Sequence, residues 1–267
     1  MPQIRKLLVA SSKGGVGKST AALGVAAEFA KLGKRVILAD TDCTSRSLDL
    51  LTGCEDRALF NLADLIDGDD PEKIGVVPYA SLPELRLIPA PTVRRLRELC
   101  HERDMTEAEL MWACVGALDD WDGYDLLVCD TGGGLDAACS TASFFDRVLV
   151  VSGQSQTSVR AAEYAASRLE RCGNAQLRLC VCGFDLSAVR KEKRAGLIEM
   201  IDASSLQLEG VIPFDPGLAL CQDRGQLPPR NSPVTVACRN IALRILGRDV
   251  PLFEGMPALA RRRQLAL

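Results

Sequence analysis

Apolar runs of strand length alternate with helical patterns along nearly the whole chain. Seven such runs predict buried strands, because the strands of a parallel sheet are covered on both faces. They lie at residues 4–10, 35–39, 85–89, 124–129, 147–151, 177–182 and 208–212. Helical spacing of apolar residues marks 20–32, 93–100, 107–118, 158–171, 188–201 and 234–246. The alternation predicts an α/β fold with a mostly parallel central sheet and helices on both faces.

The chain has no internal repeat, low-complexity tract or Gly/Ser-rich linker that would divide it. Its turn-rich stretches at 67–71 and 227–233 are typical of loops. Its 267 residues are enough for one α/β domain with a sizeable core. We therefore predict a single domain over residues 1–250 and a short tail at 251–267.

Composition narrows the class of protein. The formal net charge of −3 argues against coating nucleic acid by bulk charge, although a local basic patch stays open. No signal peptide is recognisable at the start, and the apolar runs are too short to cross a bilayer. Eleven cysteines without a secretion signal indicate a reducing compartment rather than a disulfide framework. These features predict a soluble cytoplasmic protein.

A glycine-rich loop follows the first predicted strand. The stretch S-S-K-G-G-V-G-K-S-T spans residues 11–20 and leads into the first predicted helix, which is the context of a phosphate-binding loop. Glycines let several backbone N–H groups converge on a phosphate, and the helix N-terminus adds partial positive charge. We expect the loop to hold phosphates with Gly14, Gly15, Val16 and Gly17.

Three polar side chains close this loop. Lys18 would reach the β- and γ-phosphates, the Ser19 hydroxyl would ligate Mg²⁺, and Thr20 would donate to the α-phosphate. The strict pattern G-x-x-x-x-G-K-[ST] is not met, because Ser12 stands at the first glycine position. A tight strand-to-helix turn with chance lysines is the plain alternative, but three glycines, a lysine and two hydroxyls in this order favour phosphate binding.

The stretch K-G-G-V-G-K-S-T, residues 13–20, resembles the deviant Walker A motif of the MinD/ParA family of P-loop ATPases. In that family two subunits close face to face over two ATP molecules, and an extra lysine of each subunit contacts the phosphates held by the other. The resemblance gives this role to Lys13. It implies a three-layer P-loop NTPase fold, ATP and Mg²⁺ as ligands, and a homodimer that forms on ATP binding. A cation that arrives only on dimerisation would couple ATP binding to assembly and stabilise transition-state charge.

Two predicted strands end in aspartates. The stretch A-D-T-D-C-T-S-R-S-L-D-L, from residue 39, is similar to the first switch region of MinD. By this resemblance Asp42 orients the attacking water, and Asp40 lies on the Mg²⁺ side. Asp130 ends the strand at 124–129 and is expected to meet Mg²⁺ through water. The predicted catalytic residues are Lys13, Lys18 and Asp42, and the predicted metal-site residues are Ser19, Asp40 and Asp130.

Two positions depart from the family pattern. T-G-G-G at 131–134 is closer to the second switch of the related flagellar-number ATPases, the FlhG type, and three glycines indicate a mobile switch. The adenine-reading Asn of the family is replaced by Cys182. We therefore expect base recognition to rely on the backbone around Pro213 and Asp215, within G-V-I-P-F-D at 210–215.

The tail is P-L-F-E-G-M-P-A-L-A-R-R-R-Q-L-A-L. MinD proteins attach to the inner membrane through a C-terminal amphipathic helix, so the resemblance implies apolar tail residues facing lipid and arginines meeting anionic head groups. These residues are Leu252, Phe253, Met256, Leu259, Leu265, Arg261, Arg262 and Arg263. Because Gly255 and Pro257 interrupt the segment, a solvated terminus is the alternative.

The resemblance covers nearly the whole chain and implies a MinD-like ATPase for septum site selection. It would dimerise on ATP, bind membrane or partner proteins in that state, and release them after slow hydrolysis. Its partners would be an activator protein and a division-inhibitor-type effector, and it would be cytoplasmic, with peripheral attachment to the inner membrane.

Several alternatives stay open. An FlhG-type regulator of flagellar number shares the chemistry. A ParA-type segregation ATPase would bind DNA through Arg239, Arg244 and Arg248. A non-catalytic, nucleotide-gated binding module would follow if the altered second switch has lost turnover. A subunit-bridging iron–sulfur cluster, held by Cys139 with Cys100 as a second ligand, is the remotest alternative.

Overall fold

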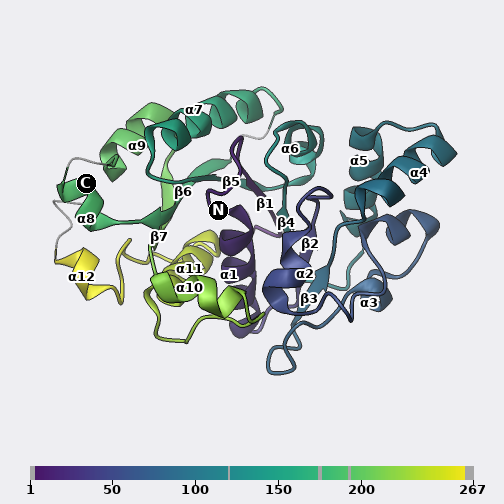
Figure 1. The fold of residues 1–267 in the computed structure, drawn as a ribbon, viewed down its shortest axis with the longest axis horizontal. Coiled ribbons are helices and arrows are strands. Elements are labelled where there is room, and N and C mark those ends of the chain that lie inside the picture. The colour runs from purple at the N-terminus through teal and green to yellow at the C-terminus, as the bar shows by residue number, and fades with distance from the viewer. Residues whose placement is uncertain (1–3, 120, 174–175, 192–193, 262–267) are drawn as a thin grey trace.

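The computed structural model describes residues 4–119, 121–173, 176–191 and 194–261. Seven parallel strands form one sheet in the order β3-β2-β4-β1-β5-β6-β7 (Figure 1). The strands are β1 (Lys6–Ala10), β2 (Val36–Asp40), β3 (Leu85–Ile88), β4 (Leu126–Asp130), β5 (Arg147–Ser152), β6 (Leu177–Phe184) and β7 (Leu208–Pro213). Each of the seven predicted strands is confirmed, and so is the parallel sheet.

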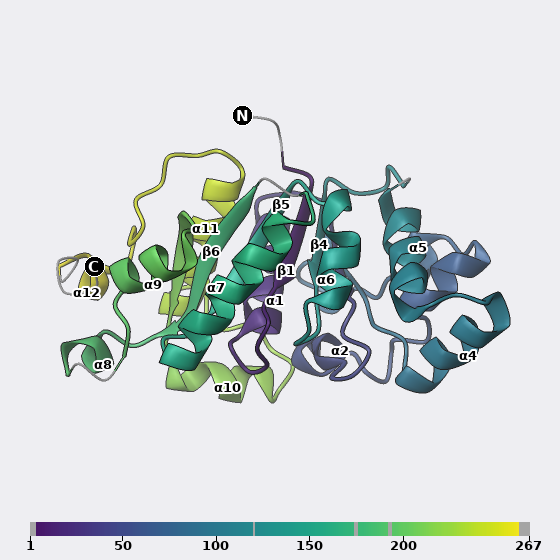
Figure 2. The ribbon, with the colours of Figure 1, turned by 90° about the horizontal axis from the view of Figure 1, so that it is seen from above.

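Helices cover both faces of the sheet, as predicted. They are α1 (Lys18–Lys31), α2 (Ser47–Thr52), α3 (Pro71–Ile74), α4 (Val93–Arg103), α5 (Glu107–Asp119), α6 (Asp136–Thr141), α7 (Gln156–Glu170), α8 (Leu186–Arg190), α9 (Leu197–Ser204), α10 (Pro216–Gln222), α11 (Pro233–Ile245) and α12 (Pro257–Ala260), with 3-10 turns η1 (Leu62–Asp67) and η2 (Ala142–Phe144). One layer holds α1, α10 and α11, and the other holds α6, α7 and α9. Figure 2 looks onto the second layer, with α4 and α5 together at one end.

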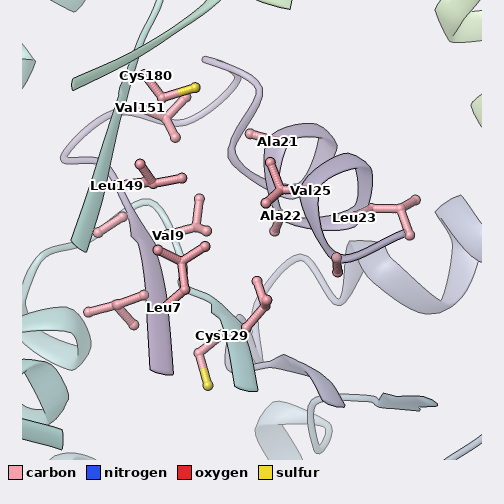
Figure 3. Packing of buried hydrophobic residues seen from close by; sticks show 14 of the residues in the cluster. Leu7, Val9, Ala21, Ala22, Leu23, Val25, Cys129, Leu149, Val151 and Cys180 are labelled. Atoms are coloured by element: carbon pink, nitrogen blue, oxygen red, sulfur yellow. The ribbon is translucent and has the colours of Figure 1, made fainter. Parts of the chain in front are cut away.

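One part of the core lies between α1 and the central strands. Ala21, Ala22 and Val25 of α1 are fully buried and turn toward the strands, where they meet residues such as Val9 and Leu149 (Figure 3). Small side chains on this face let the helix axis approach the sheet closely, and close packing is what a stable interior requires. Each large aliphatic side chain buried here contributes about 1.5–3 kcal/mol.

The topology places the glycine-rich loop at the switch point of the sheet. β1 lies between β4 and β5, and the loop leaves β1 where connections on its two sides diverge. Open α/β sheets bind ligands at this point, beyond the carboxyl ends of the strands. On the neighbouring strands β2 and β4, Asp40 and Asp130 are register partners. The fold therefore brings both predicted metal-side carboxylates to the loop.

Some predicted elements differ in extent. The helix predicted over 188–201 is two helices, α8 and α9, and α9 begins after Gly196, whose backbone is extended. The short helices α2, α6 and α10 were not predicted, because six or seven residues carry too little apolar periodicity to mark a helix.

The start of the tail packs against the domain. Phe253, Met256 and Leu259 are buried in the same core cluster as the sheet residues. The Asn240 side chain donates a 2.8 Å hydrogen bond to the carbonyl of Glu254, which fixes the segment to α11. The prediction that these three apolar residues face lipid is therefore wrong for this conformation, because they fill the domain's own core.

Leu252 is half-buried, and Arg261 is exposed. The other tail residues of that prediction, Arg262, Arg263 and Leu265, lie outside the described residues. In the part of the chain that the structure describes, no helix is both long and apolar enough to span a membrane.

Candidate nucleotide-binding site

The glycine-rich loop adopts a backbone that only glycine accepts readily at two positions. Gly15 and Gly17 have φ values of 72° and 96°, and Gly17 is the N-cap of α1. A Cβ atom on Gly17 would also lie 2.4 Å from the Sγ of Cys182, so the loop and β6 meet without room for a side chain. The loop's backbone N–H groups precede the N-terminus of α1, which is the arrangement that cradles phosphate.

Two cavities flank the loop. The smaller one, about 400 Å³, is lined on the loop side by Lys18 and Ser19 and on the switch side by Asp42, Ser47 and Gly133. The larger one, about 590 Å³, lies between the loop and the ends of β6 and β7. Its lining includes Lys13, Gly14, Gly15, Val16, Gly17, Thr20, Pro213 and Asp215. The smaller cavity suits the terminal phosphates, and the larger one suits the rest of a nucleotide.

The hydroxyls of Ser19 and Thr20 each accept a hydrogen bond from a different helix. The Ser47 hydroxyl of α2 donates to Ser19 over 2.9 Å, and the Gln222 amide of α10 donates to Thr20 over 2.8 Å. The predicted metal ligand and the predicted α-phosphate ligand are thus held by residues that sequence reasoning missed. Ser47 lies within a stretch matched to the switch region, whereas nothing in the local sequence marks Gln222.

Asp130 and Asp40 are fully buried, and their environments differ. Burial raises the pKa of Asp130 to about 7, although Ser19 and Lys18 are near enough to lower it in part. Neither carboxylate oxygen of Asp130 has a hydrogen-bond partner among the described residues. Burial, followed by the charge of Asp130, raises the pKa of Asp40 to about 8. Asp40 accepts hydrogen bonds from the backbone N–H groups of Asp42 and Leu48.

These carboxylates fit a magnesium site. An unpartnered, buried carboxylate is costly, and a cation beside it would remove that cost. Within the described residues there is no group of three or more His, Cys, Asp or Glu side chains that would hold a metal by themselves. Mg²⁺ is commonly bound in this way, through one or two carboxylates together with water, hydroxyl and substrate phosphates. Ser19, Asp40 and Asp130 are therefore a suitable donor set for it.

Asp42 lies at the edge of the smaller cavity and is 9% exposed. Its Oδ1 accepts hydrogen bonds from the backbone N–H groups of Thr44 and Ser45. A Cβ atom on Gly132 would lie 3.3 Å from the same carboxylate, so the second switch loop passes directly against Asp42. The two predicted switches therefore meet at the side chain predicted to orient water.

Lys13 is held within its own subunit. Its Nζ donates to the hydroxyls of Ser155, Thr157 and Ser158 over 3.3, 2.7 and 3.1 Å. These residues surround the start of α7, on the opposite side of the loop from Asp42. Lys18, by contrast, is 7% exposed and lies in the loop's own phosphate site. The two lysines of the motif thus occupy different surroundings.

Apart from the exposed Arg194, the polar side chains near β6 and β7 in the larger cavity are already bonded to protein. The Gln154 amide donates to Ala195 and its carbonyl accepts from the N–H of Asp185. Asp215 caps α10 by accepting from Gly217, and Phe214 is 64% exposed at the rim. Cys182 is nearly buried, with its sulfur against the loop.

The two cysteines named for an iron–sulfur cluster both have raised pKa values. Cys139 lies beside Cys172, and burial together with this neighbour raises the pKa of its thiol to about 11. The pKa of Cys100 is also raised, mainly by burial.

The comparisons define the class of protein. The ParA family model, described as "NUBPL iron-transfer P-loop NTPase", matches residues 3–246. The chain belongs to this family of P-loop NTPases. Within it the chain is similar to MinD proteins, as the following relatives indicate.

The septum site-determining protein MinD of Synechocystis is 29% identical over 258 residues, which are 95% of this chain and 94% of that protein. The MinC:MinD cell division protein complex of Aquifex aeolicus contains a chain with a TM-score of 0.80 and 26% identity, covering 93% of this chain and 98% of that one. MinD of Pyrococcus horikoshii, complexed with Mg-ADP, has a TM-score of 0.73 and covers 90% and 95%; at 18% identity it supports the fold alone. The predicted family and fold are confirmed.

Proposed function

We propose that this chain is an ATP-driven switch in septum site selection, which dimerises with ATP bound, engages partners in that state and releases them after hydrolysis. One observation carries the nucleotide chemistry: a buried, unpartnered Asp130 lies beside the lysine and hydroxyl that end a phosphate loop. The similarity to septum site-determining relatives over almost their whole length supports the cellular role.

In this mechanism the loop N–H groups and Lys18 bind the β- and γ-phosphates, and Thr20 donates to the α-phosphate. Ser19, Asp40 and Asp130 would hold Mg²⁺, which would neutralise phosphate charge. Asp42 orients the attacking water from the edge of the smaller cavity. The N–H groups of Thr44 and Ser45 bond to its Oδ1, so Oδ2 is the oxygen proposed to hold the water, and we expect slow intrinsic turnover. An activator protein would complete this arrangement.

Lys13 acts in the partner subunit. In the dimer it leaves the hydroxyls at the start of α7 and reaches the phosphates held by the other copy, where its charge stabilises the transition state. Because three neutral hydroxyls bind an ammonium less strongly than a phosphate does, the exchange favours the closed dimer once ATP is bound.

The partners follow from the relatives. The Aquifex MinD chain is found with MinC, so an effector of that kind is proposed here. Attachment to an anionic membrane surface through the tail would require Phe253, Met256 and Leu259 to leave the core, or would use only the residues beyond Arg261. We propose that the protein is cytoplasmic and attaches peripherally to the membrane. In this proposal residues 251–267 form a separate segment whose function is the attachment.

DNA binding gains little support. Of the three arginines proposed for it, Arg244 donates to the carbonyls of Val250 and Leu208 and is half-buried. Only Arg239 and Arg248 of that set are exposed. Two cations on a chain of net charge −3 make a weak phosphate-binding surface.

The decisive experiment measures assembly and turnover together. Sedimentation velocity of the full chain should show a dimer with ATP and a monomer with ADP, and Asp42→Ala should hold the dimer by blocking hydrolysis. Phosphate release, with and without anionic liposomes, gives the turnover. A monomer in both nucleotides, with no turnover, would refute the switch.

Liposome pelleting should compare the full chain with a chain that ends at Arg261, which keeps the buried part of the tail. Loss of ATP-dependent pelleting on this truncation would assign membrane attachment to the last six residues. If pelleting persists, another part of the chain binds the membrane. If no condition gives pelleting, the proposal of membrane attachment is wrong.

A further inference from the structure

Gln222 joins the nucleotide site to a helix that the proposed chemistry does not use. It is the last residue of α10, it is half-buried, and it lines the larger cavity beside the loop. Its Nε2 donates to the Thr20 hydroxyl over 2.8 Å, across 202 positions of sequence.

This hydrogen bond restricts the direction of the Thr20 proton. A hydroxyl has one hydrogen to donate and lone pairs that accept. Because the Gln222 amide occupies a lone pair, the Thr20 hydrogen points away from the amide. Among the described residues the Thr20 hydroxyl donates to no protein acceptor. The hydrogen is thus available to an anion in the cavity that both residues line.

The same helix also reaches the first switch. After Gln222 the chain turns through Gly225, which abuts Gly53 at the end of α2. A Cβ atom on Gly225 would lie 2.5 Å from the Cα of Gly53, so the two backbones are in direct contact. At its other end, α2 provides Ser47, which bonds Ser19. Two adjacent loop hydroxyls are therefore each held by one of two helices, and those helices touch.

We propose that Gln222 is a positioning residue of the nucleotide site, which orients the Thr20 hydroxyl toward the α-phosphate and links nucleotide binding to α10 and α2. The inference rests on the proposed function, in which Thr20 contacts the nucleotide. It adds a residue whose effect is on nucleotide affinity and not on the hydrolytic step, since the α-phosphate does not take part in the transfer.

The test is a double-mutant cycle on ADP affinity, measured with a fluorescent ADP analogue. Gln222→Ala should weaken binding about fivefold, the worth of one hydrogen bond. Gln222→Glu should weaken binding further. A carboxylate would accept the Thr20 hydrogen, which the amide leaves for the α-phosphate, and its charge would repel the phosphates. Gln226→Ala, an exposed glutamine on the same loop, is the matched control and should leave affinity unchanged.

The cycle partner is Thr20→Val, which removes the hydroxyl but keeps the shape. If Gln222 acts through Thr20, Gln222→Ala should have no further effect in the Thr20→Val background. Additive losses, or unchanged affinity in Gln222→Ala, would overturn the inference. In ATP turnover, Gln222→Ala should raise KM and leave kcat within about twofold, whereas an equal fall in kcat would also overturn it.

The cycle also separates this inference from the proposed function. If Thr20→Val binds ADP as tightly as the parent chain, the nucleotide site itself is wrong. If Thr20→Val weakens binding while Gln222→Ala does not, the site stands and the role of Gln222 falls.

Discussion

The phosphate end and the base end of the nucleotide cleft are built in opposite ways. At the phosphate end, side chains from the loop, β2, β4 and α2 converge, and at least one buried carboxylate is left without a partner. At the base end, Gln154 and Asp215 already bond to protein, and a thiol packs against the loop. The phosphate end can therefore accept a cation, whereas the base end offers few side chains that could recognise a base. Affinity should therefore come mainly from the triphosphate.

The largest expected effect comes from a substitution at the phosphate end. Lys13→Ala should lower ATP turnover by about 10³-fold, as the loss of a cation supplied in trans does, while ADP affinity changes by less than about threefold. Phosphate release and ADP titration on the same preparation check this. Lys73→Ala, an exposed lysine on α3, is the control. Equal losses in binding and turnover would instead place Lys13 at the phosphates of its own subunit.

Lys18→Ala should weaken nucleotide affinity by at least about 100-fold, because the buried lysine supplies charge-assisted hydrogen bonds to the phosphates. Calorimetric titration with ADP and Mg²⁺ measures it. The contrast between the two ends would be contradicted if Lys18→Ala weakened nucleotide binding less than a substitution at the base end such as Cys182→Ala.

Gly17→Ala tests the contact between the phosphate loop and Cys182 of β6, where the phosphate end meets the base end. A positive φ of 96° and a Cβ atom 2.4 Å from the Cys182 sulfur should together lower the free energy of unfolding by about 2–4 kcal/mol. Urea unfolding without nucleotide gives the value. Adding Cys182→Ala should recover part of the loss by removing the sulfur, and the backbone strain should remain. Full recovery would show that φ is not strained in this loop.

The buried carboxylates predict a pH dependence confined to the phosphate end. In the folded chain the pKa of Asp130 is about 7 and that of Asp40 about 8, both above the ordinary value of 3.8. Between that value and the raised ones, the folded state keeps protons that the unfolded chain has released, so the free energy of unfolding should fall as pH rises.

Thermal unfolding in EDTA should therefore show a melting temperature that decreases from about pH 5.5 to about pH 8.5. Asp130→Asn should flatten this decrease, and Mg²⁺ with ADP should remove it. A melting temperature that rises over the same range would contradict the raised pKa values.

The smallest effect belongs to the base end. Because the usual amide is replaced by Cys182 and the N–H of Phe214 is bonded to Phe184, GTP should bind within about tenfold of ATP. Competition titrations measure the ratio. Cys182→Asn should increase the preference for ATP. A preference above about 100-fold in the parent chain would show that the backbone near Pro213 reads adenine effectively.

The sequence predicted which residues lie together at the phosphate end, because most of them are close in the sequence or end a strand. Gly14 to Thr20 are contiguous, and Asp40 and Asp130 each end an apolar run, so a parallel sheet brings them together. The hydrogen bond between Gln222 and Thr20 was beyond prediction, since its partners are 202 positions apart and neither lies in a shared pattern. The hydroxyls that hold Lys13 were missed for the same reason, although S-Q-T-S at 155–158 was visible as a polar cluster after a strand.

The tail was interpreted by analogy, and the structure uses its first half differently. Amphipathic spacing in a short segment is equally compatible with a membrane and with a protein core. Only the packing of Phe253 and Met256 against the rest of the cluster distinguishes the two.

That packing has a kinetic consequence. If the residues that pack against α11 also serve the membrane, the segment must first detach, and lipid can capture only the detached form. The observed rate of attachment would then rise with lipid concentration and level off at the rate of detachment. Stopped-flow mixing with vesicles would measure that plateau rate. Its inverse is the average time for which the tail segment stays packed against the domain.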